Sequence, residues 1–292
     1  MLNLAGVYTA LATPFRNGAV DYPALRALLQ EQIDAKVAGV VPVGTSGESP
    51  TLDVTEHIKV IEETIKFVNG RCQVIAGTGA NSTSEALAFT AEAAKLGADA
   101  SLQVTPYYNK PTQEGLYRHF STVADKTGLP IVVYNVPGRT GIAVAVETIA
   151  RLAKNPLVAA VKEAGGSVDR VSAIRDACDV TVLSGDDSLT VPMISVGAKG
   201  IISVASNVIP AEMVKMVSAA LAGDFKTAGE FHRKYYPLFR DLFIESNPIP
   251  VKAALAALGK IALEYRLPLC ELAPANREKL LATMKKCGLN VC

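Results

Sequence analysis

The sequence predicts a (β/α)8 barrel with a small helical appendage at its C-terminus. Eight short apolar runs, each long enough for one buried strand, recur between residues 6 and 205. The segments between them have the apolar periodicity and the terminal residues of α-helices. Eight such units in roughly 220 residues favour a closed parallel barrel, in which helices surround the strands. An open doubly wound sheet is the alternative, because it requires no set number of strands.

The predicted strands follow one another at intervals of roughly 20 to 35 residues, the size of one strand–helix unit. All but the first are short and rich in Val, Ile or Ala, as expected of strands that helices cover. They are expected at Gly6–Ala12, Gly39–Gly44, Gln73–Thr78, Ala100–Thr105, Pro130–Asn135, Leu157–Lys162, Val180–Gly185 and Gly200–Ala205.

The segments between the strands carry helix-terminal signals. Asp21 is positioned to cap a helix that should end before Gly39. Ser82 and Glu85 have the spacing of a capping box, in which both side chains bind the first turn of a helix. Gly97 and Gly128 are expected to end two further helices. The apolar stripe of the first helix comprises Leu25, Leu28, Leu29, Ile33 and Val37.

Beyond about residue 208 only helical patterns occur. A helix over Ile209–Ala222 should complete the ring around the barrel. We therefore predict a catalytic barrel in residues 1–223 and an appendage in residues 224–292, packed on the barrel or on another subunit. Asp224 should cap the first appendage helix. The appendage helices are expected at Phe225–Ile244, Val251–Leu258 and Asn276–Cys287.

The composition excludes several classes of protein. A net charge of +1 lacks the basic surface that nucleic acids or anionic membranes attract. No apolar run is long enough to span a membrane, and the N-terminus does not resemble a signal peptide. The five cysteines lack CxxC spacing, which favours a reduced cytoplasmic protein, with Cys287 and Cys292 as exposed thiols. The three histidines lack the spacing of zinc ligands, so we expect no metal and no cofactor.

Two glycine-containing loops resemble nucleotide-binding motifs but are incomplete. The loop from Gly39 to Ser46 has Walker A spacing, yet Thr45 stands where the phosphate-binding lysine is required. The loop from Gly77 to Ser82 lacks the last glycine of a dinucleotide fingerprint. Neither loop therefore predicts a nucleotide site.

The C-terminal ends of the predicted strands should meet at one mouth of the barrel, where such folds place their active sites. Hydroxyls, phenols, one lysine and one arginine gather there, with few carboxylates and no histidine. This argues against a hydrolase with paired carboxylates and against a Ser-His-Asp nucleophile. It suits covalent catalysis by an amine on a keto acid, with phenols and hydroxyls moving protons. The segments at the mouth are Thr13–Pro14, Gly44–Ser49, Gly77–Gly79, Thr105–Asn109, Tyr134–Arg139, Lys162–Glu163, Ser184–Asp187 and Ser203.

Lys162 is the candidate amine, because it ends a buried apolar strand. Its own strand leaves two interpretations open. The lysine forms a salt bridge with a group such as Glu163, or it is desolvated and acts as a nucleophile. The nearby Asp186 and Asp187 are expected to cap the next helix, without a chemical role.

Five motifs stand in the order and at the intervals of a known family. The chain resembles the dihydrodipicolinate synthases (4-hydroxy-tetrahydrodipicolinate synthases), of the pyruvate-dependent lyase group that includes N-acetylneuraminate lyase. The resemblance implies a (β/α)8 barrel that condenses pyruvate with aspartate semialdehyde in lysine and diaminopimelate biosynthesis. The motifs are GTSGES at Gly44–Ser49, TPYYN at Thr105–Asn109, YNVPGRT at Tyr134–Thr140, VKE at Val161–Glu163 and SGDD at Ser184–Asp187.

The resemblance also implies a role for each matching residue. Lys162 would form the Schiff base with pyruvate, and Tyr134 would act as general acid and base. Thr45 would link Tyr134 to Tyr108, which in the family reaches into a neighbouring subunit's site. A homo-oligomer is therefore implied, at least a dimer and usually a tetramer. Pyruvate would be held by Ser46 and the Ile202 backbone, with Gly185 leaving room beside it, and Arg139 would bind the carboxylate of the aldehyde.

Some relatives are inhibited by lysine at the dimer interface, and the resemblance leaves open whether this chain is. Val54 stands where lysine-sensitive relatives often carry a histidine. The positions that match the effector site are Ser49, His57, Asn81, Glu85 and Tyr107.

Two other functions compete with the condensation. One is a lyase of the same group that acts on a sugar keto acid, such as N-acetylneuraminate or 2-keto-3-deoxygluconate. Arg139 favours the shorter substrate, because an aldehyde with its own carboxylate needs a cation there. The other is a non-catalytic barrel that binds keto acids, which predicts that Lys162, Tyr134 or Thr45 is missing, whereas all three are present.

Overall fold

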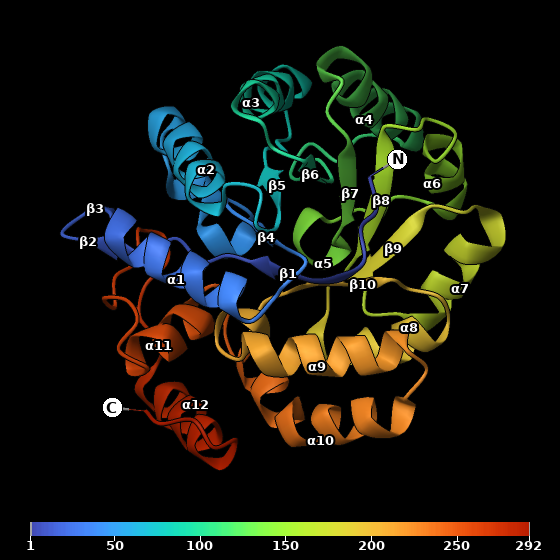
Figure 1. The fold of residues 1–292 in the computed structure, drawn as a ribbon. Helices are drawn as coiled ribbons and strands as arrows, with labels where there is room; N and C mark the ends of the chain where they lie inside the picture. The colour runs from blue at the N-terminus through green and yellow to red at the C-terminus, as the bar shows by residue number, and fades with distance from the viewer. Residues whose placement is uncertain (1, 292) are drawn as a thin grey trace.

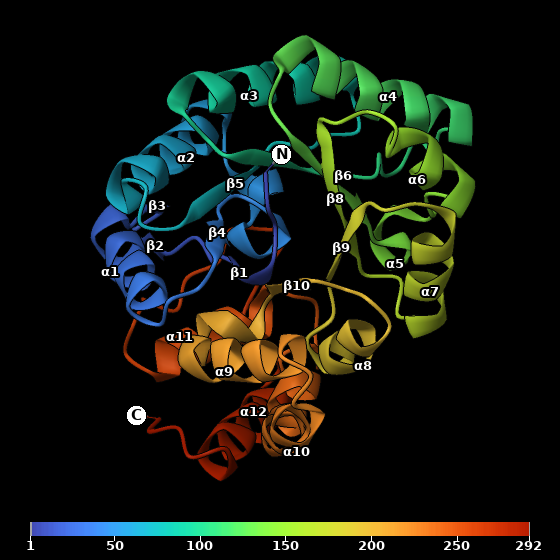
Figure 2. The ribbon, with the colours of Figure 1, turned by 45° about the vertical axis from the view of Figure 1, so that its right-hand side comes forward.

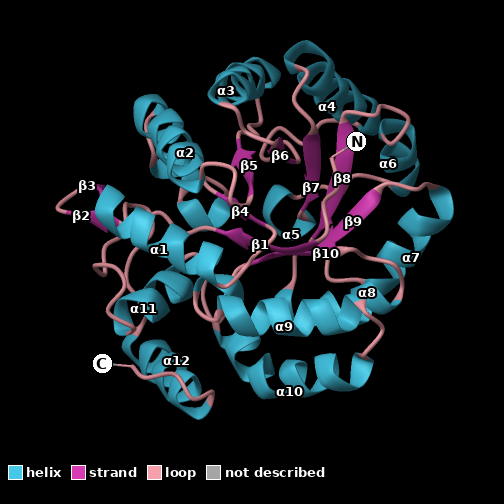
Figure 3. Cartoon of the chain, viewed as in Figure 1, coloured by secondary structure: helices cyan, strands magenta, loops and turns pink. Residues whose placement is uncertain are grey.

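The computed structural model describes residues 2–291, and its strands form a closed parallel barrel (Figures 1 and 3). The predicted fold is therefore confirmed, and the doubly wound sheet is excluded. A separate hairpin pairs β2 (Phe15–Arg16) with β3 (Ala19–Val20). The barrel strands are β1 (Gly6–Ala10), β4 (Gly39–Val41), β5 (Gln73–Gly77), β6 (Ala100–Val104), β7 (Ile131–Asn135), β8 (Val158–Glu163), β9 (Thr181–Ser184) and β10 (Gly200–Ser203).

Helices surround the strands, as the alternating sequence pattern predicts (Figure 1). The ring comprises α1 (Tyr22–Asp34), α2 (Val54–Val68), α3 (Thr83–Leu96), α4 (Gln113–Thr127), α6 (Val146–Leu152), α7 (Val168–Ala177), α8 (Thr190–Ser195) and α9 (Pro210–Leu221). The short α5 (Pro137–Thr140) lies in the loop after β7. The appendage consists of α10 (Phe225–Asp241), α11 (Ile249–Ala257) and α12 (Pro274–Lys286).

Alternation along each strand separates two buried layers. Side chains such as Ala160 and Leu183 form the interior of the barrel, whereas Val161 and Val182 belong to the layer between strands and helices. Because successive strand residues point to opposite faces, Lys162 shares the interior face with Ala160.

Helix termini confirm part of the prediction. The carboxylates of Asp21 and Asp224 accept backbone N–H groups at the starts of α1 and α10. Gly97 and Gly128 end α3 and α4 in the left-handed conformation that glycine favours.

One predicted helix terminus is wrong and another is displaced. The helix α1 ends before Gly39, as predicted, but already at Asp34, and Lys36 takes the left-handed position (φ 62°). Gly39 is the first residue of β4, as predicted for that strand, and a Cβ atom there would come within 2.7 Å of the Tyr8 ring. The predicted capping box at Ser82 is wrong, because the Ser82 hydroxyl bonds to Ser84 and makes no cap bond to α3.

The C-terminal helices pack on one another and on the barrel. In Figure 2, α10 lies outside α9, and α12 packs against both α10 and α11. The predicted bounds are close to those observed, but α10 ends three residues earlier than predicted, at Asp241, and α11 and α12 each begin two residues earlier, at Ile249 and Pro274. Cys287 is buried rather than exposed, and Cys292 lies outside the described residues. The division at residues 223 and 224 stays a prediction, and no helix between residues 2 and 291 is long and apolar enough to cross a membrane.

Candidate active site

Lys162 lies inside the barrel near the C-terminal end of β8. Its side chain is buried, and Nζ lies 4.2 Å from the centre of the Tyr134 ring. The two residues are register partners on β7 and β8, so the parallel pairing itself places the amine beside the phenol ring.

The alternative of a salt bridge between Lys162 and Glu163 is wrong. Glu163 points into the outer layer, where it accepts hydrogen bonds from Arg170 Nε (2.8 Å) and Asn135 Nδ2 (2.8 Å). Strand alternation turns the two neighbouring side chains in opposite directions. Within residues 2–291, no hydrogen bond or ion pair is formed by Nζ of Lys162, which leaves its nitrogen available to a substrate.

Lys162 opens into a cavity of about 70 Å³. A neighbouring cavity of about 220 Å³ shares Thr45, Tyr134 and Arg139 with it and extends to Tyr107 and Ser49. Six of the residues predicted for catalysis and substrate binding line the smaller cavity: Thr45, Ser46, Tyr134, Arg139, Lys162 and Gly185.

Two predicted residues do not line these cavities. Tyr108 extends from the loop after β6 with 90% of its surface exposed, in the left-handed conformation (φ 72°). Ile202 is fully buried among the interior side chains of the barrel, and Val204 is the residue of that segment that lines the smaller cavity.

Asn247, between α10 and α11, connects two of the predicted residues and was not found from the sequence. Its Nδ2 donates to Ser46 Oγ (3.0 Å), and its backbone carbonyl accepts from Arg139 Nη2 (3.1 Å). Ser46 and Asn247 lie 201 residues apart in the chain, so no local pattern could relate them.

The turn that carries Thr45 and Ser46 is fixed by a buried ion pair. Glu48 takes the left-handed conformation (φ 54°), and its carboxylate pairs with Lys252 of α11. Neither side chain is exposed, and burial lowers the pKa of Lys252. The Nζ of Lys252 also lies 4.2 Å from the centre of the Phe15 ring.

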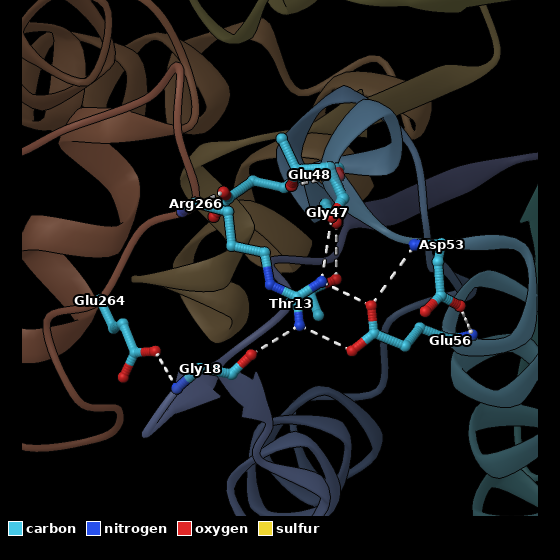
Figure 4. A network of polar contacts seen from close by, with 9 residues as sticks. Thr13, Gly18, Gly47, Glu48, Asp53, Glu56, Glu264 and Arg266 are labelled. Atoms are coloured by element: carbon cyan, nitrogen blue, oxygen red, sulfur yellow. Dashed lines mark hydrogen bonds and ion pairs between the residues drawn. The ribbon is translucent and has the colours of Figure 1, made fainter.

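Figure 4 shows how further polar contacts hold the same turn. Thr13 Oγ1 donates to the carbonyl of Gly47 (2.7 Å). The backbone N–H of Arg266 donates to Glu48 (3.3 Å), and its guanidinium pairs with Glu56 of α2. The C-terminal segment therefore supports the turn on which Thr45 and Ser46 lie.

Gly185 is required by the packing between β8 and β9. A Cβ atom at this position would lie 2.5 Å from the Cβ of Ala164 and 3.2 Å from the carbonyl oxygen of Glu163. The backbone N–H of Gly185 donates to that carbonyl (2.7 Å). The absence of a side chain is thus needed by the strand ends themselves, in addition to any space it leaves in the cavity.

Asp186 and Asp187 do not cap the following helix, contrary to the prediction. The carboxylate of Asp187 turns to the end of β10, where it accepts the N–H groups of Val204 and Ala205 and the hydroxyl of Ser203. Burial raises the pKa of Asp187 to about 6. Asp186 lines the cavity of Lys162, and burial raises its pKa although the charge of Lys162 opposes the shift.

The five residues predicted for an effector site are only partly brought together. Asn81 Nδ2 donates to the carbonyl of Tyr107 (3.2 Å). The pKa of the Tyr107 phenol is raised, mainly by burial and to a smaller extent by the negative charge of the exposed Glu85. Ser49 lies in the larger cavity with Tyr107. His57 is buried, stacks on Phe89 at 4.4 Å between ring centres and has its pKa lowered to about 4 by burial.

The whole chain is similar to proteins of one family. Residues 3–287 match the model of the dihydrodipicolinate synthetase family. The 4-hydroxy-tetrahydrodipicolinate synthase of Thermodesulfovibrio yellowstonii is 51% identical over 286 residues, which cover 97% of this chain and 98% of that protein.

Solved structures give the same result. The dihydrodipicolinate synthase from Aquifex aeolicus has 49% sequence identity and a TM-score of 0.97, over 99% of both chains. The enzyme from Cyanidioschyzon merolae, solved with lysine bound, has 40% identity and a TM-score of 0.95, over 98% of this chain and 99% of that one.

Proposed function

The chain belongs to the dihydrodipicolinate synthetase family, and from this premise we propose that Lys162 carries its reaction as a Schiff base. The reaction is the condensation of pyruvate with L-aspartate 4-semialdehyde to 4-hydroxy-tetrahydrodipicolinate, in lysine and diaminopimelate biosynthesis. The observation that supports Lys162 most directly is its unpaired amine in the cavity beside Tyr134. The enzyme is a lyase of the class I aldolase type.

The chemistry begins when the neutral amine of Lys162 attacks the keto carbon of pyruvate. A C–N bond forms, water leaves, and loss of a methyl proton converts the iminium to an enamine. The enamine carbon then forms a C–C bond with the aldehyde carbon of the second substrate. Attack of that substrate's amino group on the former keto carbon closes the ring and releases Lys162.

Tyr134 is the acid and base that these proton transfers require. Its phenol ring is fixed against Nζ of Lys162 by the pairing of β7 with β8. Thr45, which lines both cavities with Tyr134, passes protons between Tyr134 and Tyr108. Tyr108 is 90% exposed in the single chain, which supports its assignment to the site of another subunit.

Two groups of donors hold the substrate carboxylates. We assign the pyruvate carboxylate to Ser46 and the backbone near Ile202, with Gly185 beside it. Asn247 already donates to Ser46 Oγ, so the serine hydroxyl hydrogen is free to donate to pyruvate. Arg139, which the Asn247 carbonyl orients, binds the carboxylate of the aldehyde.

The active enzyme is a homo-oligomer, at least a dimer and in our proposal a dimer of dimers. The exposed Tyr107 and Tyr108 are the residues that support this interface. We place an effector site for lysine at the same interface, at Ser49, Asn81, Glu85 and Tyr107. His57 belongs to this proposed effector site as well, through its buried imidazole ring.

A turnover assay tests the proposed function. Pyruvate with aspartate semialdehyde should give a cyclic product, whereas pyruvate with N-acetylmannosamine should not react. A preference for N-acetylmannosamine would instead identify a sugar keto-acid lyase.

A further inference from the structure

The strand positions that follow Tyr134 and Lys162 carry two buried polar side chains that the proposed reaction does not use. Asn135 and Glu163 are register partners at the ends of β7 and β8, and both are 0% exposed. Asn135 Nδ2 donates to both carboxylate oxygens of Glu163, at 2.8 Å and 3.0 Å. A polar bridge therefore crosses from one strand to the other, one residue beyond the amine and the phenol.

Packing does not account for this bridge. Strand alternation turns both side chains outward, into the layer between strands and helices, where the preceding outward residues are Val133 and Val161. Burying a carboxylate in such a layer is unfavourable unless hydrogen bonds replace its water. Two more apolar residues would fill the layer without that penalty. The bridge is therefore expected to serve a purpose other than the burial of apolar surface.

The Glu163 carboxylate is bonded by donors from three segments of the barrel mouth. Besides Asn135 of β7, these are Arg170 Nε of α7 and the backbone N–H of Gly165, each at 2.8 Å. The N–H comes this close because residue 165 has no side chain, since a Cβ atom there would lie 2.6 Å from the carboxylate oxygen. The carboxylate thus joins both strands to the helix and the loop that follow β8.

The same bridge reaches the segment that carries Arg139. Val144 lies five residues further along the chain, and its N–H donates to Oδ1 of Asn135 (2.9 Å). The carbonyl of Val144 accepts from Arg170 Nη2. Both backbone polar groups of Val144 are therefore bound by residues that also bind Glu163. One set of bonds consequently fixes β7 against β8 and anchors the segment behind Arg139.

We propose that Asn135 and Glu163 are positioning residues, which hold β7 and β8 in the register that places the Lys162 amine beside the Tyr134 ring. They act through the strands, because they point to the face opposite the cavity. Such alignment matters, since a displacement of about 1 Å can slow a reaction about 100-fold. The inference rests on the proposed function, in which Lys162 forms the Schiff base and Tyr134 transfers protons.

The test measures kcat with pyruvate and aspartate semialdehyde per active site, and the sites are counted as the Lys162 residues that pyruvate and borohydride can trap. Glu163→Gln keeps the shape of the side chain but sets an amide NH2 group against the donors around it. We expect kcat per trapped site to fall about 10-fold to 100-fold. The kcat/KM for each substrate should fall by the same factor, because alignment is lost while substrate contacts are kept.

A reciprocal exchange distinguishes loss of the bridge from loss of a side chain. In the double variant Asn135→Asp with Glu163→Gln, the glutamine amide can donate to the aspartate, so the bridge and the net charge return with opposite polarity. Its kcat per trapped site should exceed that of either single variant by at least about threefold.

Arg170→Lys is a milder variant, because it keeps a positive charge beside Glu163 and loses the bond to Val144. It should lower kcat per trapped site about threefold to 10-fold. An unchanged kcat per trapped site in both Glu163→Gln and Arg170→Lys would overturn the inference, as would a double variant no more active than the single ones.

Asp241→Asn is the matched control for a loss of stability alone. It alters another buried carboxylate, which Arg240 and Thr283 bind away from the barrel strands, between α10 and α12. It should lower the Tm and leave kcat per trapped site unchanged, and an equal fall in kcat per trapped site would contradict a specific role for the bridge. Wild-type protein that pyruvate and borohydride do not modify would instead refute the proposed function.

Discussion

Replacement of Lys252 by methionine tests whether the buried ion pair holds the active-site turn. Both Lys252 and Glu48 have 0% side-chain exposure, so the substitution leaves a carboxylate buried without its ammonium partner. Breaking such a pair costs about 3–5 kcal/mol. The positive charge of Arg266 remains beside Glu48, so we expect the lower end, about 3 kcal/mol.

Thermal unfolding measures this loss. At about 2 °C per kcal/mol for a chain of this size, Lys252→Met should lower the Tm by about 6 °C. The matched control is Lys260→Met, which breaks a partly exposed pair with Glu31 and should lower the Tm by no more than about 2 °C. The double variant Lys252→Met with Glu48→Gln should recover part of the loss, because no buried charge is left unpaired. Equal Tm values for Lys252→Met and Lys260→Met would refute the reasoning.

Three further predictions follow from the site and the core. Arg139→Ala should raise the KM for aspartate semialdehyde about 10-fold to 100-fold while pyruvate trapping persists, and equal loss of both would contradict its role. Gly185→Ala should lower the free energy of unfolding by about 1–3 kcal/mol, measured by thermal unfolding, because the new Cβ would lie 2.5 Å from the Cβ of Ala164. Gly138→Ala is the control and should be neutral, because a Cβ at that position would have no neighbouring atom within 4 Å. Burial lowers the pKa of His57 and His119 to about 4, so the unfolded chain binds more protons below about pH 6.5 and stability falls between there and pH 4. Replacing both histidines by glutamine should flatten that decline in Tm against pH, and an unchanged slope would argue against buried neutral rings.

The strands could be predicted because each is a separate apolar run with its own boundaries. Lys162 and Tyr134 followed from the rule that strand ends meet at one mouth, and the structure places them in register. Helix ends are harder to predict from the sequence, because several residues near each end could supply the cap. The true capping box, at Asp53 and Glu56, has the same spacing as the pattern that failed at Ser82.

The parts of the site that the sequence did not predict depend on contacts between distant segments. Glu48 is paired with a residue 204 positions away, and Ser46 with one 201 positions away. Lys252 lies inside the Ala-rich helix α11, where the sequence pattern alone predicts an exposed side chain. It is buried only because the folded chain packs α11 against the barrel. Asp187 reads as a helix cap, yet its carboxylate binds the end of the neighbouring strand, which only the barrel brings near.

The covalent role of Lys162 is tested most directly by borohydride reduction in the presence of pyruvate. Peptide mapping by mass spectrometry should find one irreversible adduct, of the mass of pyruvic acid less one oxygen, on Lys162. Lys252, a fully buried lysine of α11, should remain unmodified, because its ammonium is paired with Glu48. An adduct on another lysine, or no adduct at all, would contradict the central claim.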